Sequence, residues 1–589
     1  YYGGNFVFKS TDRGDNWTKV SPDLTNNEAR DKKEIMGRVP DRFTMSRHDG
    51  VQQWPTITSL VESPRNKDIL WAGTDDGNLH VARDGGKSWT NVAGKVPGVP
   101  KGTYVSRVIA SHHADGTAYA TFDGHRSNDF GIYVFATTDF GATWKAIRNG
   151  IPDNKGVVNV IREHHRTPEL LFVGTEYGAY VSFDRGANWT RIKMGLPMVP
   201  VDDIAIHPRD NDLILGTHGR SIWILDDISS LEQMSAQVAN SDFQLFDTRP
   251  AINWRRVGRT TSASTGHKMF FGANPPDGLI IQYYLKKGVE EGAEDEDEEA
   301  ENEPQQRPAA AQGQRQSPVR ITITDAAGKT VRTLDGTART GINRVIWNFR
   351  ADSPIPRQVL AGLGGGGRFG IAAQLRRGGA QVDPGTYTVK VSHQGKELSK
   401  PLTVSEDPRV QISDADRAAR RKALDELAQM IGPAFTGQRQ IQALRTAVDN
   451  EIQSWRRQGG ARPPENVRKA AEDFLKKIDE VYPKFATRPQ QQALGAAGPP
   501  LTFTPPPLPN RLGQLAGAIE GWTAAPSASQ LEQMKLIFTQ LQEAQAALKK
   551  LVDEDLPALN KLMNEAGVQH IAVPQPRARS AQGQGRPPE

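Results

Sequence analysis

The sequence repeats one octapeptide pattern four times, as STDRGDNW (residues 10–17), ARDGGKSW (82–89), TTDFGATW (137–144) and SFDRGANW (182–189). Each copy has an Asp two positions before a Gly, ends in Trp, and is followed three residues later by Val or Ile. The four Asp residues lie 72, 55 and 45 residues apart. Self-similarity of this kind indicates repeated structural units that stack on one another. The pattern therefore predicts consecutive β-sheet units separated by insertions of different length.

The residue types of the repeat all have structural roles. An Asp carboxylate in a tight turn accepts backbone N–H groups, Gly adopts a positive φ, and Trp buries a large surface between neighbouring sheets. We therefore predict that these carboxylates hold turns and are not catalytic. The repeat residues are Asp12, Gly14 and Trp17; Asp84, Gly86 and Trp89; Asp139, Gly141 and Trp144; and Asp184, Gly186 and Trp189.

The pattern resembles the Asp-box, or bacterial neuraminidase (BNR) repeat, of sialidases, xyloglucanase-type glycosidases and sortilin-type propellers. Longer stretches, at 123–144, 158–189 and 216–227, resemble a family of large exported bacterial proteins often labelled glycosyl hydrolase, and the resemblance covers nearly the whole chain. It implies a β-propeller and a location in the periplasm, in the cell envelope or outside the cell. It implies no particular reaction.

The propeller is predicted over residues 1–237 and contains about five blade-like units. The last unit, at 216–227, has Asp226 and Asp227 where a box would begin, and no Gly or Trp follows, so it resembles a terminal blade. A closed propeller usually needs more blades, and the sequence starts without Met inside a strand pattern. We therefore expect a further N-terminal part of the propeller to precede this sequence.

A ligand site is predicted at the end of the blades opposite the boxes. If each box joins the third and fourth strands of a four-stranded meander, the turns between the second and third strands lie at that other end, and loops on a rigid scaffold often bind ligands. The alternative is that these turn residues are simply solvated. The candidate residues are Asp75, Asp76, Asp123, His125, Arg126, Glu176, Tyr177, His218 and Arg220.

Three functions remain open at this stage. The first is an exported scaffold that binds a protein, peptide or glycan without catalysis. The second is a glycoside hydrolase, sialidase-like or xyloglucanase-like, which needs two carboxylates about 5–10 Å apart on the same face. Tyr177 beside Glu176 suggests a sialidase pair, but adjacent strand residues point in opposite directions. The third is a structural component of the envelope or matrix.

Composition and residue spacing disfavour several other functional classes of protein. The chain has 589 residues, a net charge of +5 and no Cys, which removes disulfides and thiolate metal sites. The pairs His112–His113 and His164–His165 lack metal-site spacing, so we predict no metal and no cofactor. Basic residues do not cluster with aromatics, which disfavours nucleic-acid binding. No apolar run reaches about 18 residues, so no membrane span is predicted.

The remaining sequence changes character twice. Residues 243–408 contain β runs and resemble an Ig-like β-sandwich with Trp347 in its core, interrupted by a charged low-complexity insert at 288–316 that we expect to be disordered. Residues 411–571 have helical periodicity and predict an α-helical bundle, with helices from about 411 and near 436–457, 464–486, 509–523 and 528–567. Pro557 should interrupt the last helix. The linker 495–510 is proline-rich, and a disordered tail is expected at 572–589.

Overall fold

The structure is a computed structural model that describes residues 1–34, 38–44, 54–153, 156–193, 195–255, 272, 274–288, 318–355, 378–456, 463–487 and 505–572. The chain divides into two compact units. The first consists of Tyr1–Thr248, Ile280–Gly313 and Thr337–Arg344, and the second of Arg249–Leu279, Gln314–Gly336 and Val345–Glu589. The boundaries 1–237, 243–408 and 411–571 for three domains remain a prediction.

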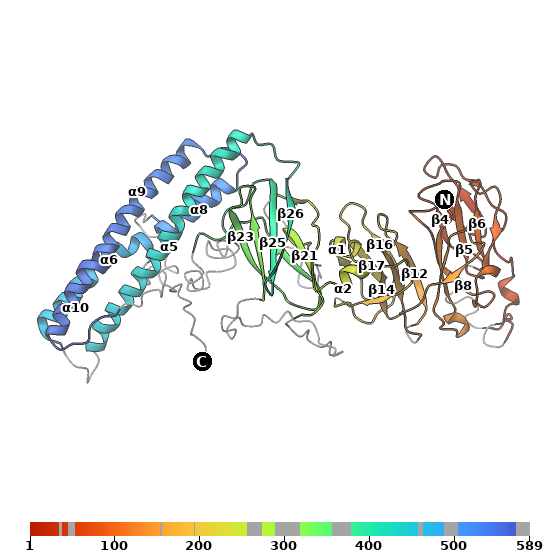
Figure 1. The fold of residues 1–589 in the computed structure, drawn as a ribbon, viewed down its shortest axis with the longest axis horizontal. Helices are drawn as coiled ribbons and strands as arrows, with labels where there is room; N and C mark the ends of the chain where they lie inside the picture. The colour runs from red at the N-terminus through yellow and green to blue at the C-terminus, as the bar shows by residue number, and fades with distance from the viewer. Residues whose placement is uncertain are drawn as a thin grey trace. The chain divides into compact units, whose positions relative to one another are not determined.

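Three antiparallel four-stranded sheets form the centre of the first unit (Figure 1). In each, the four strands pair in sequence order, so each sheet is a meander. The first contains β4 (Ile57–Glu62), β5 (Leu70–Thr74), β6 (Leu79–Ala82) and β7 (Thr90–Asn91); the second β8 (Tyr104–Ala110), β9 (Ala118–Asp123), β10 (Tyr133–Thr137) and β11 (Lys145–Ala146); the third β12 (Val158–Glu163), β13 (Leu171–Thr175), β14 (Gly178–Ser182) and β15 (Thr190–Ile192).

A three-stranded sheet lies on each side of these three in the sequence. The earlier one contains β1 (Tyr2–Gly3), β2 (Val7–Lys9) and β3 (Thr18–Lys19), and the later one β16 (Val201–Ile206), β17 (Leu213–Thr217) and β18 (Ile222–Leu225). In the complete sheets the box joins the third and fourth strands, as predicted. By this criterion the earlier sheet corresponds to strands two to four and the later sheet to strands one to three.

Consecutive sheets pack face to face through apolar side chains. Trp71 of β5 meets the box residue Trp144 of the next sheet edge to face, with ring centroids 6.0 Å apart. Separate buried clusters join the preceding pair of sheets and the two following pairs in the same way. Sequential four-stranded meanders stacked through apolar faces are the organisation of propeller blades. The first unit is thus propeller-like, and its described residues form five blade-like sheets.

A regular polar bond also links the first strands of neighbouring sheets. Each first strand has a β-bulge. The bulge residue donates to the backbone of the next sheet in three cases: Thr58 to Val105 O at 2.8 Å, Ser106 to Val158 O at 2.8 Å, and Asn159 to Val201 O at 3.4 Å. In the fifth sheet the bulge residue is Asp202.

Two further sheets lie in the region where the sandwich is predicted. One has the order β19-β21-β24 and follows two short helices, and its strand β24 begins in the first unit and ends in the second. In the second unit the order is β20-β26-β25-β22-β23, with β20 parallel to β26 and the other pairs antiparallel. The elements are α1 (Ser229–Glu232), α2 (Ala236–Asn240), β19 (Phe243–Leu245), β20 (Ala251–Asn253), β21 (Leu279–Leu285), β22 (Val319–Thr324), β23 (Thr330–Gly336), β24 (Gly341–Trp347), β25 (Gly385–His393) and β26 (Lys396–Glu406). Trp347 is fully buried, as predicted, whereas the Ig-like character of the region remains a prediction.

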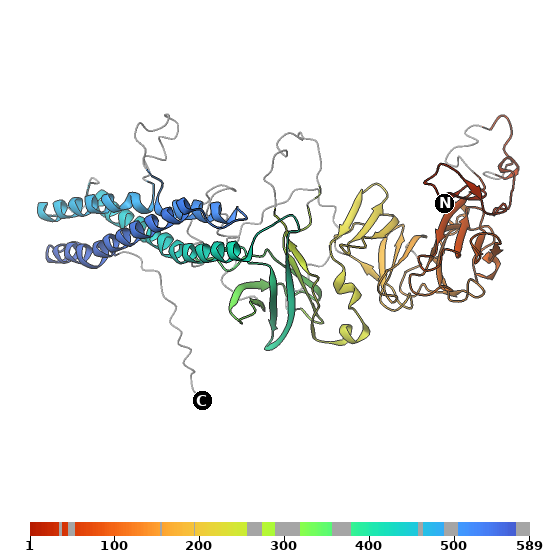
Figure 2. The same ribbon diagram turned by 90° about the horizontal axis from the view of Figure 1, so that it is seen from above.

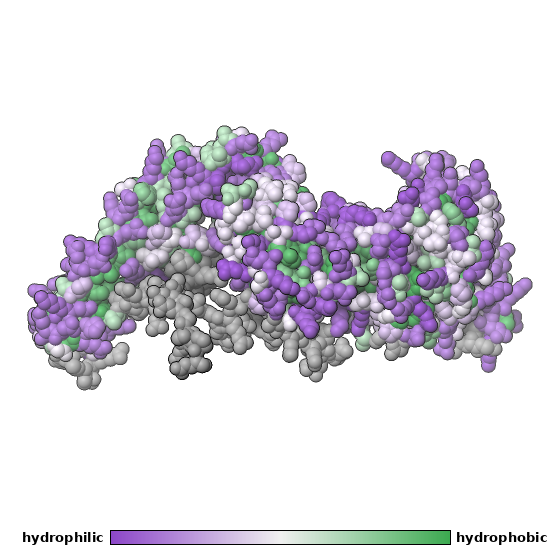
Figure 3. Space-filling view, in the orientation of Figure 1, coloured by the Kyte–Doolittle hydropathy of each residue, from purple (hydrophilic) through white to green (hydrophobic). Residues whose placement is uncertain are grey.

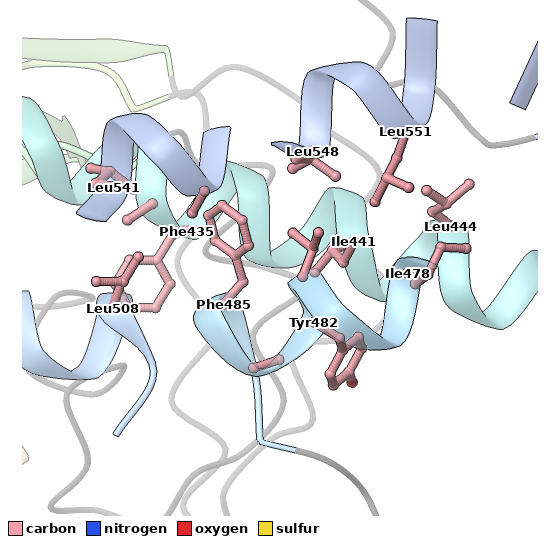
Figure 4. Packing of buried hydrophobic residues seen from close by; sticks show 14 of the residues in the cluster. Phe435, Ile441, Leu444, Ile478, Tyr482, Phe485, Leu508, Leu541, Leu548 and Leu551 are labelled. Carbon is pink, nitrogen blue, oxygen red and sulfur yellow. The ribbon is translucent and has the colours of Figure 1, made fainter. Parts of the chain in front are cut away.

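Long helices of the second unit run side by side and share one apolar core (Figures 1, 2 and 4). They are α5 (Asp414–Arg456), α6 (Glu465–Phe485), α8 (Leu508–Glu520), α9 (Ala528–Lys550) and α10 (Leu556–Glu565). A π-helical turn, Leu551–Asp555, separates α9 from α10 beside Pro557, so the predicted interruption is confirmed. The prediction of two helices between 411 and 457 is wrong, because α5 continues through Pro433. None of the described helices combines the length and apolarity that a membrane span requires.

Candidate functional site

In each box turn the Asp carboxylate accepts hydrogen bonds from residues of the same turn. In the box at 182–189, Ser182 Oγ donates to Asp184 Oδ1 at 2.7 Å, and Asn188 donates to the same carboxylate through its backbone N at 2.8 Å and its Nδ2 at 2.7 Å. Ser182 Oγ in turn accepts the Gly186 N–H at 2.8 Å. Asp12, Asp84 and Asp139 accept the matching backbone and side-chain bonds in their own turns.

These bonds keep the box carboxylates ionised. Hydrogen bonds from Thr143 lower the pKa of Asp139 to about 2, and those from the Asn16 backbone, Ser10 and the Asn16 side chain lower the pKa of Asp12 to about 2. A carboxylate held in this way is a poor proton donor and has its lone pairs occupied. This geometry supports the structural role inferred from the sequence, which stays a prediction.

The box tryptophans follow the predicted pattern with one exception. The indole N–H of Trp89 donates to Val20 O at 3.1 Å, and that of Trp189 to Ile147 O at 2.6 Å, each in the preceding sheet. Trp144 is buried against the preceding sheet as described above. Trp17 differs because it belongs to the first sheet of the sequence, and 48% of it is exposed.

Replacing Asp184 by Ala should lower the free energy of unfolding of the first unit by about 1–2 kcal/mol, because three donors of the turn lose their acceptor. Urea denaturation followed by tryptophan fluorescence measures the change. Asp153→Ala is the matched control, since Asp153 is exposed and, among the residues that the structure describes, pairs only with Arg148, at 2.8 Å. Equal effects of the two substitutions would contradict a structural role for the box.

The predicted site residues lie in the turns where the sequence analysis places them. Asp75 and Asp76 join β5 to β6, and Glu176 and Tyr177 join β13 to β14. Asp123 ends β9, His125 and Arg126 lie in the β9–β10 turn that follows it, and His218 and Arg220 lie in the β17–β18 turn. Three of these four turns are tied to the residue that precedes the first strand of their own sheet. Asp75 N donates to Thr56 O at 3.0 Å, Glu176 N to Val157 O at 3.3 Å, and His218 N to Pro200 O at 2.9 Å.

Asp75 and Asp76 are buried, with only 5% and 3% of their surface exposed. Asp75 Oδ1 accepts the Thr56 N–H at 2.7 Å. Asp76 accepts the Asn26 N–H at 2.6 Å and the Thr74 hydroxyl at 2.5 Å. Both carboxyl groups therefore hold the turn and its neighbouring loop, and neither is freely presented to a ligand.

The two acids nevertheless differ in their electrostatics. Burial raises the pKa of Asp75 to about 6, with a further increase from the neighbouring Asp76 charge, while the Thr56 hydrogen bond acts in the opposite direction. A carboxyl group with this pKa changes its protonation near neutral pH. Arg126 of the next sheet also acts electrostatically on Asp75, so the structure brings these two predicted residues together.

Asp75→Asn should become increasingly stabilising relative to wild type as the pH rises from about 4 to 7. The raised folded-state pKa means that protonated Asp75 stabilises the fold below pH about 4, and that this contribution is lost as the pH rises through about 6. The expected change in the stability difference is about 1–3 kcal/mol. Urea denaturation at several pH values measures it. Buried His164, whose pKa is lowered by burial, makes the same pH-dependent contribution to the stability of both proteins, so it does not change the stability difference between them. A difference that is constant with pH would contradict the prediction.

The β9–β10 turn carries a preformed pair. His125 Nδ1 lies 2.6 and 2.7 Å from the two carboxylate oxygens of Asp123. Asp123 is the last residue of β9, and His125 begins a short 3-10 helix, His125–Ser127, in the turn that follows. His125 and Arg126 are exposed, and the Arg126 guanidinium lies 5.2 Å from the ring centroid of Tyr104. This turn therefore presents an ion-pairing and aromatic surface to solvent.

The other two turns are separate from this group. Tyr177 is 42% exposed, and the Glu176 carboxylate lies against Gly156, where an added Cβ would meet Oε2 at 2.0 Å. His218 is exposed and faces Asp202 at 3.6 Å. Among the described residues, no hydrogen bond or ion pair joins Glu176 or Tyr177 to the other predicted site residues.

Sequence reasoning missed a charged group on the first strands of three sheets. Arg107 and Arg162 both donate to Asp203, which lies on β16. Charged residues within strands that are otherwise apolar were the available signal. Their meeting depends on strand order and bulge register, which the sequence does not display. In the part of the chain that the structure describes, no group of three or more His, Cys, Asp or Glu residues could hold a metal ion.

A cavity of 420 Å³ lies between α5 and α9 in the second unit. Apolar side chains of Met430, Pro433, Met534 and Phe538 line it, together with polar residues such as Lys535. Figure 3 shows hydrophobic patches among hydrophilic ones on the visible face of these helices. None of the residues predicted for the ligand site lines this cavity.

Comparisons with known proteins give limited matches. No family model matches the sequence. The oligoxyloglucan-reducing end-specific xyloglucanase of Emericella nidulans is 35% identical over 88 residues, which are 15% of this chain and 10% of that enzyme. The matched segment thus spans about a tenth of the curated relative.

Solved structures with similarity include three of different kinds. The GH74 xyloglucanase from Xanthomonas campestris is 20% identical, over 40% of this chain and 34% of that one, with a TM-score of 0.29. PorZ, a bacterial surface component of the type-IX secretion system of Porphyromonas gingivalis, is 14% identical over 68% and 49%, with a TM-score of 0.27. YCF48 from Cyanidioschyzon merolae is 16% identical over 29% and 55%, with a TM-score of 0.21.

Proposed function

We propose that this protein is an exported, propeller-like scaffold that binds a protein, peptide or glycan ligand through the turns between its second and third strands. One contrast between the two ends of the sheets carries the proposal. The box carboxylates are fully engaged within their own turns, whereas exposed polar and aromatic side chains extend from the turns at the other end. These side chains are His125, Arg126, Tyr177, His218 and Arg220. Rigid sheets that display such loops are suited to binding.

A glycan and peptide array probed with the full chain tests this proposal. A specific signal is expected, and the double substitution His218→Ala plus Arg220→Ala should reduce it about tenfold or more if charged contacts are lost. Glu169→Ala plus Arg185→Ala, an exposed pair beside a box turn, is the matched control and should leave the signal unchanged. An array without any signal, or a signal that the turn substitutions leave intact, would refute the proposed site.

Glycoside hydrolysis is the second candidate, because one segment is similar to a xyloglucanase and because the pKa of Asp75, about 6, suits a general acid. The burial of Asp75 and Asp76 speaks against it. Incubation of the full chain with xyloglucan oligosaccharides and chromogenic glycosides tests whether the protein hydrolyses glycosidic bonds. Turnover that Asp75→Asn or Glu176→Gln abolishes would support an enzyme. Absence of turnover in the parent protein would reject one for these substrates.

Location outside the cytoplasm is part of the same proposal and is supported by the family resemblance of the sequence. Fractionation of the cells that produce the protein, with detection by antibody, should place it in the periplasmic, envelope or extracellular fraction. A purely cytoplasmic signal would reject this part of the proposal without affecting ligand binding.

A further inference from the structure

Three charged side chains from three consecutive sheets meet at one carboxylate oxygen. Arg107 is on β8, Arg162 on β12 and Asp203 on β16, which are the first strands of their sheets. The Nη2 atoms of both arginines lie 3.1 Å from Asp203 Oδ1. The same oxygen accepts the backbone N–H of Ile204 at 2.9 Å. We call these three residues the arginine-pair site.

The charges in the arginine-pair site do not balance. Two guanidinium groups share one carboxylate, and arginine remains protonated in proteins. The nearest acid in sequence, Asp202, interacts instead with Asn159 at 3.3 Å and His218 at 3.6 Å. Desolvation and the neighbouring Arg107 cation lower the pKa of Arg162, which reflects this crowding of positive charge. One positive charge therefore lacks a partner among the described residues.

Hydrogen-bonding capacity is also left over. The Nε of Arg107 is buried and has no hydrogen-bond partner among the described residues, whereas the Nε of Arg162 donates to Ile204 O at 2.6 Å. The side chain of Asp203 is 58% exposed, and those of Arg107 and Arg162 are 25% and 29% exposed. Solvent and small solutes can therefore reach the exposed parts of these three side chains, although the Arg107 Nε itself is buried.

A purely structural role explains this arrangement poorly. Partly exposed ion pairs contribute only about 0–1 kcal/mol to stability. A cross-link between sheets would work as well with one arginine for each acid, without placing two cations together. Guanidinium groups, in contrast, are well suited to hold a planar carboxylate through paired N–H donors.

We propose that Arg107 and Arg162 bind the carboxylate of a sugar acid, and that Asp203 accepts hydrogen bonds from the hydroxyl groups of the same ligand. The arginines can only donate and the aspartate can only accept. A ligand that satisfies all three must therefore carry an anionic acceptor and hydroxyl donors close together, as a hydroxylated carboxylate does. The site lies on the first strands of the sheets, so it is distinct from the turn residues proposed above.

Isothermal titration of the full chain with D-galacturonate tests the proposal. D-galactose lacks the carboxylate and acetate lacks the hydroxyls, so both should bind about tenfold or more weakly than galacturonate if each group contributes one hydrogen-bonded contact. Added NaCl should weaken galacturonate binding, because the contact is ionic and partly exposed. Absence of galacturonate binding at millimolar concentrations, or equal binding of acetate, would overturn the proposal.

Arg107→Gln is the first variant, because the one hydrogen bond of the Arg107 guanidinium within the described residues is to Asp203. It should reduce galacturonate affinity about tenfold or more. Arg185→Gln, which removes the same charge from a box turn, should change nothing. The thermal unfolding midpoints of both variants should stay near that of the wild type. A folded Arg107→Gln protein with unchanged affinity would overturn the assignment.

Asp203→Asn separates the two halves of the site. Removing the Asp203 carboxylate, which competes with a ligand carboxylate for the two arginines, should strengthen acetate binding several-fold. The ratio of galacturonate affinity to acetate affinity should therefore decrease. Unchanged acetate binding would contradict competition by Asp203. The turn variant His218→Ala plus Arg220→Ala should keep galacturonate affinity, so failure of the turn proposal and failure of this one are distinguishable. Loss of galacturonate binding in the turn variant alone would assign it to the turns and overturn the arginine-pair site.

Discussion

Glu163→Ala should lower the free energy of unfolding of the first unit by about 3 kcal/mol, because it leaves several buried donors without an acceptor. Glu163 is only 5% exposed and ends β12. Its carboxylate accepts bonds from the preceding sheet and its turn: Ser111 Oγ at 2.9 Å, His112 N at 2.6 Å and Tyr119 Oη at 3.2 Å. The substitution thus removes the polar junction between two neighbouring sheets.

Urea denaturation monitored by tryptophan fluorescence measures this loss. Glu163→Gln retains the shape and one acceptor, so it should cost less, about 1–2 kcal/mol. Glu169→Ala is the matched control, because Glu169 is exposed and its side chain pairs with Arg185 at 2.8 Å. A Glu163→Ala protein as stable as the Glu169→Ala protein would show that the junction contributes nothing.

Phe485→Ala should destabilise the helical part of the second unit by about 3–5 kcal/mol, the usual cost of removing a fully buried aromatic ring. Phe485 ends α6 with none of its surface exposed, and its ring lies in the core shared with Phe435 and Leu508 (Figure 4). Circular dichroism at 222 nm during urea denaturation reports on these helices. Phe538→Ala, on the 44% exposed Phe538 of α9, is the control and should cost about 1 kcal/mol or less.

A double-mutant cycle sharpens this prediction. A Cβ on Gly437 of α5 would lie 2.6 Å from Phe485 Cε1, so Gly437→Ala should overpack the wild-type core and cost about 1–3 kcal/mol. In the Phe485→Ala background the space is free, so the same substitution should become neutral or stabilising. Additive effects of the two substitutions would contradict direct contact between these residues.

The blade-like sheets and their orientation could be predicted from the sequence because their signals are local. The box spans eight residues, and its Asp, Gly and Trp each act within the turn or on the adjacent sheet. Identification of the box turn also located the opposite turns correctly, including those with Asp75 and Glu176. What the boxes could not indicate is burial. Asp75 and Asp76 are buried, and they accept hydrogen bonds from Thr56 and Asn26, which lie 19 and 50 residues earlier in the sequence.

The rest of the candidate site depends on non-local geometry. Arg107, Arg162 and Asp203 meet only because the first strands of three sheets lie side by side in a particular register. The continuity of α5 through Pro433 is a further example. Proline normally ends or kinks a helix, but apolar residues before and after it, such as Leu427 and Phe435, are buried in the same core. Tertiary packing here outweighs the local preference.

The donor series Thr58, Ser106 and Asn159 has a consequence for the evolution of the chain. Each of these bonds joins one sheet only to the next sheet in the sequence. A duplicated sheet that carries its own donor at the bulge could therefore form the same bond with its neighbour. Repeat arrays of this type gain or lose internal units while the neighbouring junctions stay intact. Asp202, at the same bulge position of the fifth sheet, is an acceptor and offers no proton to a sixth first strand. Expansion of the array is thus compatible with the junctions between the earlier sheets, whereas a sheet stacked after the fifth would lack the bulge bond that Thr58, Ser106 and Asn159 make.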